Sequence, residues 1–115
     1  MAWEAIYYET PKGECPVRDF LDELPKAHRA KVFAAIALLQ DRGPALGFPY
    51  TSQVEGKMRE LRTHYGRQLY RILYFMDNRR RVVLLEAFEK DTVKVRLERL
   101  AVAASRLQDH LKREE

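Results

Sequence analysis

Cationic side chains interrupt an apolar stretch of the chain, KMRELRTHYGRQLYRILYF, which runs from Lys57 to Phe75. The stretch holds five Lys and Arg residues and a single carboxylate, Glu60. An arginine in the middle of a strand is costly to bury unless it is paired with an acid or faces a solvated cleft. Arg62 and Arg71 are in that position, and a guanidinium can bind a phosphate through two parallel hydrogen bonds.

Three β-strands are predicted to carry these residues: Lys57–Thr63, Gln68–Met76 and Arg81–Phe88. The polar sequence between the last two is typical of a hairpin turn. Side chains alternate along a strand, so one face of the sheet is predicted to gather Glu60, Arg62, Arg71 and Glu86, with Lys90 just beyond the third strand. Leu84 and Phe88 are expected on the side of Glu86. The opposite face is expected to pack on helices through Leu61, Ile72, Tyr74 and Leu85.

Two interpretations of the charged face stay open. Glu60 and Glu86 could neutralise Arg62 and Arg71 in a lattice of ion pairs, or the arginines could bind a polyanion. The chain has 21 Lys+Arg and 17 Asp+Glu, but residues 57–99 carry 12 basic and 6 acidic side chains, a net charge of +6. This asymmetry favours a nucleic acid or an acidic protein as the partner.

The remaining elements follow from hydrophobic spacing and helix-breaking residues. We expect a strand at Trp3–Tyr8, a short helix beginning at Pro16, and a second helix from Lys26 to about Arg42. The sequence GPALGFPYTSQ that follows is predicted to be a loop. A final helix is expected from about Val93 to Arg113, capped by Thr92. Its apolar face is predicted to hold Leu97, Leu100, Ala101, Ala104, Leu107 and Leu111. This order predicts one α+β domain, residues 1–115, with a mostly antiparallel sheet of about four strands, two N-terminal helices and a C-terminal helix.

Several classes of protein are disfavoured by the composition. Cys15 is alone, which allows no internal disulfide and fits a reducing compartment. The N-terminus has no signal-peptide pattern and no stretch has the length of a membrane span, so a cytoplasmic protein without membrane association is expected. His28, His64 and His110 lack metal-ligand spacing, and no phosphate-binding glycine loop is present. Neither a metal nor an organic cofactor is therefore expected.

The segments VEGKMRELR, YRILYF and RVVLLEAFEKDT, followed by a long helix, resemble the RelE/HigB toxins of bacterial toxin–antitoxin systems, in particular the phage-related HigB-like branch. The resemblance extends over roughly Trp3 to Leu111 and implies the RelE-like fold, with a curved sheet. Two departures occur where relatives often read H-G-F-x-K-K: this chain has Glu86 in place of the histidine and Asp91 in place of the second lysine. A proline common at the start of the last helix is also missing.

The resemblance implies a ribosome-dependent, metal-independent endoribonuclease that cuts mRNA and thereby inhibits translation. In such a reaction the 2′-hydroxyl attacks the adjacent phosphorus, with a base, an acid and cations around the phosphate. The expected catalytic residues are Arg62, Arg71, Glu86 and Lys90, with Glu60 as another possible base and His64 or Tyr65 as the acid. The expected RNA-binding residues are Lys57, Arg59, His64, Tyr65, Arg67, Arg79 and Arg81.

The expected partners are the ribosome with its mRNA and a cognate antitoxin, a helix-turn-helix DNA-binding protein. The alternative is a phage-derived protein or a toxin of the same fold that binds a protein target, such as gyrase, without cutting RNA.

Overall fold

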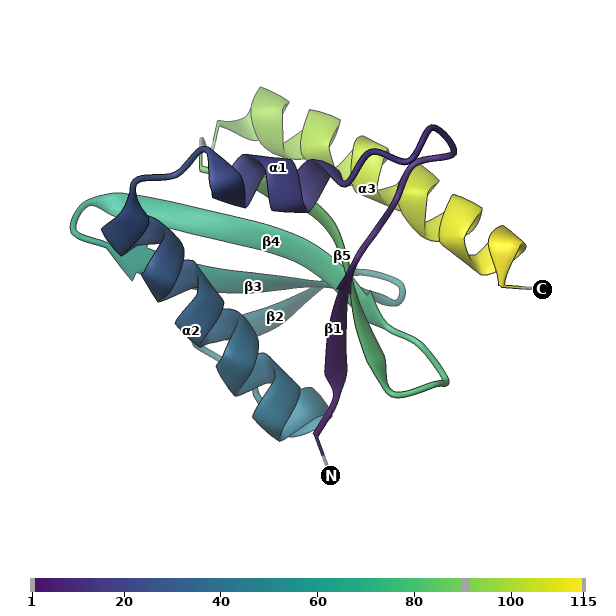
Figure 1. The fold of residues 1–115 in the computed structure, drawn as a ribbon, viewed down its shortest axis with the longest axis horizontal. Helices are drawn as coiled ribbons and strands as arrows, with labels where there is room; N and C mark the ends of the chain where they lie inside the picture. The colour runs from purple at the N-terminus through teal and green to yellow at the C-terminus, as the bar shows by residue number, and fades with distance from the viewer. Residues whose placement is uncertain (1, 90–91, 115) are drawn as a thin grey trace.

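The computed structural model describes residues 2–89 and 92–114. In this part of the chain five strands form a single sheet in the order β1-β5-β4-β3-β2, and three α-helices and one 3₁₀ helix accompany it (Figure 1). The elements are β1 (Glu4–Tyr7), α1 (Pro16–Asp22), α2 (Lys26–Arg42), η1 (Gly43–Ala45), β2 (Thr51–Glu55), β3 (Met58–Tyr65), β4 (Gln68–Met76), β5 (Arg81–Phe88) and α3 (Val93–Arg113).

The predicted α+β class is confirmed, with one strand more than expected. β2 pairs with β3 in an antiparallel hairpin whose turn includes Gly56 at a φ of 55°. The sequence predicts a loop at the start of this strand, because the preceding residues are rich in Gly and Pro. β1 is parallel to β5, and the pairs β2–β3, β3–β4 and β4–β5 are antiparallel.

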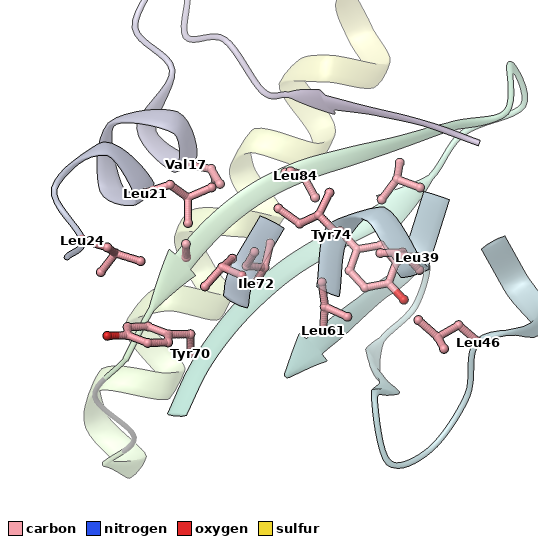
Figure 2. Close-up of a cluster of buried hydrophobic side chains, with 14 residues drawn as sticks. Val17, Leu21, Leu24, Leu39, Leu46, Leu61, Tyr70, Ile72, Tyr74 and Leu84 are labelled. Atoms are coloured by element: carbon pink, nitrogen blue, oxygen red, sulfur yellow. The ribbon is translucent and has the colours of Figure 1, made fainter. Parts of the chain in front are cut away.

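Helices cover both faces of the sheet. On one face α1 and α2 pack on Leu61, Ile72, Tyr74 and Leu84 through Val17, Leu21 and Leu39, among others (Figure 2). On the other face α3 packs through Ala103 and Leu107 on Leu73, Phe75, Val83 and Leu85. None of the helices in the described residues combines the length and apolar character that a membrane crossing requires.

A β-bulge in β5 corrects the predicted alternation of this strand. Leu73 pairs with Glu86 but Tyr74 pairs with Leu84, so Leu85 is an extra residue in the ladder. Leu85 therefore lies on the α3 side together with Glu86, and Leu84 lies on the side of α1 and α2. The prediction was wrong for these two leucines because a strict period of two cannot include the bulge.

Helix α3 begins as predicted but presents a different face to the sheet. Thr92 is its N-cap and accepts a 3.2 Å hydrogen bond from the Val95 amide. Leu97, however, is 62% exposed and Ala101 is also exposed, whereas both were predicted to face the core. The helix is rotated so that arginines as well as apolar residues contact the sheet, and the carboxylates beneath it explain why.

Candidate functional site

Two arginines lie directly opposite each other on adjacent strands. Arg62 of β3 and Arg71 of β4 are partners in the antiparallel ladder, and such like-charged pairs destabilise a sheet unless an acid compensates. Glu60 supplies that acid. Its Oε2 accepts hydrogen bonds from Arg71 Nη1 at 2.6 Å and Arg62 Nη1 at 3.5 Å. The Glu60 side chain is 0% exposed. The two arginines predicted to bind phosphate are thus brought together by one buried carboxylate.

A second buried carboxylate, Glu86, lies on the same face beneath α3. Its Oε2 accepts a 2.6 Å hydrogen bond from Arg99 Nη1, and Arg106 Nη1 lies 3.2 Å from its Oε1. Oε1 also accepts a hydrogen bond from the Ala87 amide. Both oxygens of Glu86 are therefore occupied by partners within the chain. A role for Glu86 as a catalytic base would require α3 to move.

The arginines of α3 were missed by the sequence analysis. Arg96 Nη1 lies 3.1 Å from Glu60 Oε1, in an ion pair without hydrogen-bond alignment, and Arg99 and Arg106 hold Glu86. These three residues follow helical spacing, and they occur in the same segment as Leu100 and Leu107. The sequence does contain a signal for them. Two acidic residues predicted on one face of the sheet need compensating cations, and the helix that covers this face must supply them.

The β3–β4 hairpin end of the sheet carries exposed residues that could reach a ligand. His64 lies two residues beyond Arg62 on β3, and both residues line a hollow of about 300 Å³ with Lys31 of α2. The other lining residues are Pro49, Tyr50 and Thr63. Tyr65 stacks on His28 with ring centroids 4.2 Å apart, and Arg67 is exposed in the turn. Predicted residues Arg62, His64, Tyr65 and Arg67 thus gather near this end.

Three other predicted RNA-binding residues lie at the opposite end of β4, a strand of 9 residues that spans roughly 27 Å at about 3.4 Å per residue. Lys57 and Arg79 line a separate hollow of about 470 Å³. Arg81 donates a 2.6 Å hydrogen bond to Asp77 Oδ2 and also binds Glu114. Although burial alone would raise the pKa of Asp77, hydrogen bonds from Arg81 and Arg79 hold it below its usual value. Arg81 therefore has a clear structural contact at this end.

Arg59 is the last of the predicted residues that the structure describes, and it lies elsewhere. Arg59 is on the face that packs against α1 and α2, where its Nη2 donates a 3.2 Å hydrogen bond to Thr51 Oγ1. It is therefore separated from Arg62 and Arg71 by the sheet itself. Lys90 lies outside the described residues, as does Asp91.

Among the residues that the structure describes, one group of side chains has the spacing of a metal site. Ligand atoms of Asp77, His110 and Glu114 lie within 4.8 Å of one another. Arg81, however, binds both carboxylates, so a guanidinium already supplies the positive charge there. The chemistry of this donor set fits a structural ion-pair cluster better than a cation site.

Comparisons with known proteins give two matches. Residues 19–108 match the family described as Phage derived protein Gp49-like (DUF891). A Mycobacterium tuberculosis (strain ATCC 25618 / H37Rv) protein named "Putative toxin HigB2" is 40% identical over 76 residues, which is 62% of this chain. The match spans 38% of that relative's length.

Proposed function

The chain belongs to the Gp49-like family of phage-derived proteins, and we propose that it is the toxin of a toxin–antitoxin pair that cleaves mRNA on the ribosome. The family match and the similarity to a protein named as a HigB toxin confirm the resemblance to the phage-related HigB-like branch. These two matches support the proposal that the chain is a toxin. The RNA-directed activity rests on the geometry of the charged face.

One observation carries the proposal: Arg62 and Arg71 lie side by side on adjacent strands, held by Glu60 beneath them. Paired guanidinium groups match the oxygens of a phosphodiester and the charge that grows on it during cleavage. Because Glu60 is buried and holds both arginines, it orients them before RNA binds. Such preorganised charge is usually the largest contribution to catalysis.

In the proposed reaction the RNA 2′-hydroxyl gives up its proton to water and attacks the neighbouring phosphorus to form a 2′,3′-cyclic phosphate. The bond to the 5′-oxygen of the next nucleotide breaks, and that oxygen takes up a proton. Arg62 and Arg71 stabilise the phosphate charge. His64 is exposed, lies next to Arg62 in the 300 Å³ hollow, and is the residue best placed to transfer a proton. Lys90 is proposed to stabilise the leaving group. No metal or organic cofactor takes part in this mechanism, and the ribosome would orient the mRNA.

A toxin of this kind requires a partner that silences it. We propose a co-expressed antitoxin, a helix-turn-helix DNA-binding protein with an acidic segment that covers the basic part of the chain. Residues 57–99, with a net charge of +6, provide the matching charge for such a segment.

The proposal is tested by expressing the chain alone from a tightly controlled promoter. Pulse labelling should show protein synthesis stopping before DNA and RNA synthesis, and mapping of mRNA 5′ ends should reveal new cuts within translated regions. Purified protein should produce the same cuts on translating ribosomes. An arrest in which DNA synthesis fails first and mRNA stays intact would instead indicate a protein target such as gyrase.

A further inference from the structure

An exposed aromatic ring stands beside the cationic hollow, on the loop between η1 and β2. Phe48 is 84% exposed, and Tyr50 is also exposed. An isolated apolar residue on a surface needs no explanation, but this ring is adjacent to Arg62, whose guanidinium carbon lies 5.7 Å from the ring centroid. The loop therefore extends the surface proposed to bind RNA with a flat apolar face.

The loop is fixed at both ends, which keeps the ring from folding onto the core. Leu46 is buried, and its carbonyl accepts a 2.6 Å hydrogen bond from Thr51 Oγ1. The amides of Tyr50 and Thr51 both donate to the Gly47 carbonyl, at 3.0 and 3.1 Å. These contacts close residues 47–50 into a turn. Phe48 is consequently presented to solvent on a hydrogen-bonded turn.

Arg62 joins this turn to the phosphate-binding face. Its Nη2 donates a 3.2 Å hydrogen bond to the Pro49 carbonyl, while its Nη1 reaches Glu60. The backbone adds a further link, because the Arg62 amide donates to the Tyr50 carbonyl at 2.9 Å. A ligand on Phe48 would thus be held at a fixed position relative to Arg62 and Arg71.

The chemistry of the hollow selects one class of occupant. Its described lining residues include the cations Lys31 and Arg62, the imidazole of His64 and the hydroxyl of Thr63, and no carboxylate. Cations favour an anion, and an open aromatic face favours a planar group above it. An acidic peptide would use the cations, but it does not carry an aromatic base at a regular spacing from each negative charge. A nucleotide of single-stranded RNA uses both, since bases stack on aromatic side chains while phosphates contact cations.

We infer that Phe48 and the adjacent hollow bind one nucleotide of single-stranded RNA, with the base stacked on the Phe48 ring and the phosphate between Lys31 and Arg62. The inference rests on the proposed function, because Arg62 is shared with the phosphate-binding pair. This inference gives a role to the turn at residues 47–50, which holds none of the RNA-binding residues expected from the sequence. This subsite would position the strand beside the cleaved bond without taking part in the chemistry.

The test compares two ligands: a fluorescent seven-nucleotide single-stranded RNA, and the same ribose-phosphate backbone without bases. Phe48→Leu keeps an apolar side chain but removes the aromatic face, and it should weaken binding of the RNA about tenfold. Binding of the abasic backbone should not change. Lys31→Gln should weaken both ligands. Phe33→Leu is the matched control, since Phe33 is an exposed phenylalanine on α2 and not on the turn whose ring lies beside Arg62.

The inference is overturned if Phe48→Leu binds both ligands as the parent does, if it weakens both equally, or if the parent binds neither. It is also overturned if an acidic peptide competes for the hollow and its binding depends on Phe48 to the same extent. The proposed function is judged separately, by mRNA cleavage on ribosomes. If Phe48→Leu cleaves mRNA with the KM of the parent, the proposed nucleotide subsite is rejected and the proposed nuclease function is kept. If RNA binding depends on Phe48 but the parent cleaves no mRNA, the subsite is kept and the proposed nuclease function is rejected.

Discussion

Arg71 on β4 donates a 2.6 Å hydrogen bond to Glu60 on β3, and the Glu60 side chain is fully excluded from solvent. Of the two interpretations that the sequence left open, the ion pair is therefore present. It does not exclude phosphate binding, because the same contact fixes the guanidinium beside Arg62. We regard Glu60 as a positioning residue and the two arginines as the proposed phosphate ligands.

This double role predicts that two substitutions of Arg71 will separate stability from activity. Arg71→Ala breaks a buried ion pair and should lower the free energy of unfolding by about 3 kcal/mol. Arg71→Lys keeps the positive charge and most of the stability, but an ammonium cannot reproduce the bidentate contact. It should therefore lose about 10²–10³-fold in cleavage rate. Denaturant unfolding and ribosomal mRNA cleavage on the same purified variants provide the measurement. Parental cleavage by Arg71→Lys would make Arg71 a structural residue only.

Local sequence patterns were sufficient for most of the elements. The second helix, the strands at Gln68–Met76 and Arg81–Phe88, and the last helix begin and end where spacing, proline and turn residues predict. The pairing of Glu60, Arg62 and Arg71 on one face also followed from simple alternation. These features depend on residues close together in the chain, where propensity and periodicity are informative.

Features that depend on contacts between distant segments were not predicted. β2 exists because it pairs with β3, and its own sequence is a weak strand pattern. The bulge at Leu85 is a local irregularity in the pairing of β4 with β5, which no periodicity reveals. The rotation of α3 follows from Glu86, which the helix meets with Arg99 and Arg106. An apolar stripe alone placed Leu97 in the core. The buried carboxylates instead orient α3 so that its arginines face the sheet and Leu97 is exposed, because an uncompensated buried charge costs more free energy than one exposed leucine.

His64 is predicted to transfer a proton in the cleavage reaction. His64→Gln retains a hydrogen-bonding side chain of similar size but cannot exchange a proton near neutral pH. Cleavage on ribosomes should fall about 10²-fold or more, the usual contribution of a general acid or base. Because His64 is exposed, the unfolding midpoint should stay at the parental value. His28→Gln is a useful comparison, since His28 hydrogen-bonds Tyr70 and does not line the hollow. Equal effects of both substitutions on cleavage would remove the specific role of His64.

Glu86 is predicted to stabilise the packing of α3. Glu86→Gln leaves Arg99 and Arg106 without their carboxylate and should lower the free energy of unfolding by about 2–3 kcal/mol. Ribosomal cleavage measured well below the melting temperature should stay within a few fold of the parent. The same variant tests the expected role of Glu86 as the catalytic base. A hundredfold loss of cleavage at parental stability would identify Glu86 as the base.

The folded state is predicted to lose stability as the pH falls through the range where His110 titrates. Burial holds the pKa of His110 below its ordinary value of 6.5, although Glu114 and Asp77 oppose the shift and Arg81 adds to it. Below about pH 6.5 the unfolded chain binds a proton that the folded chain resists, so the free energy of unfolding decreases as the pH falls toward the lower folded pKa. His110→Gln should flatten this part of the profile. Urea unfolding between pH 5 and 8 measures it, and identical slopes for parent and variant would contradict the assignment.

Association with the antitoxin is predicted to depend strongly on salt. Residues 57–99 carry a net charge of +6, and long-range attraction of an acidic segment raises the association rate until added ions screen it. Raising NaCl from 0.1 to 0.5 M should slow association about tenfold or more, with a smaller change in dissociation.

Arg67→Glu, at an exposed turn within the basic segment, should reproduce part of this loss at low salt. Lys12→Glu makes the same change of charge in the exposed loop before α1 and should have little effect. If both substitutions slow association equally, net charge alone governs the encounter. An association rate independent of salt would contradict the prediction, because the basic segment would then not steer the antitoxin.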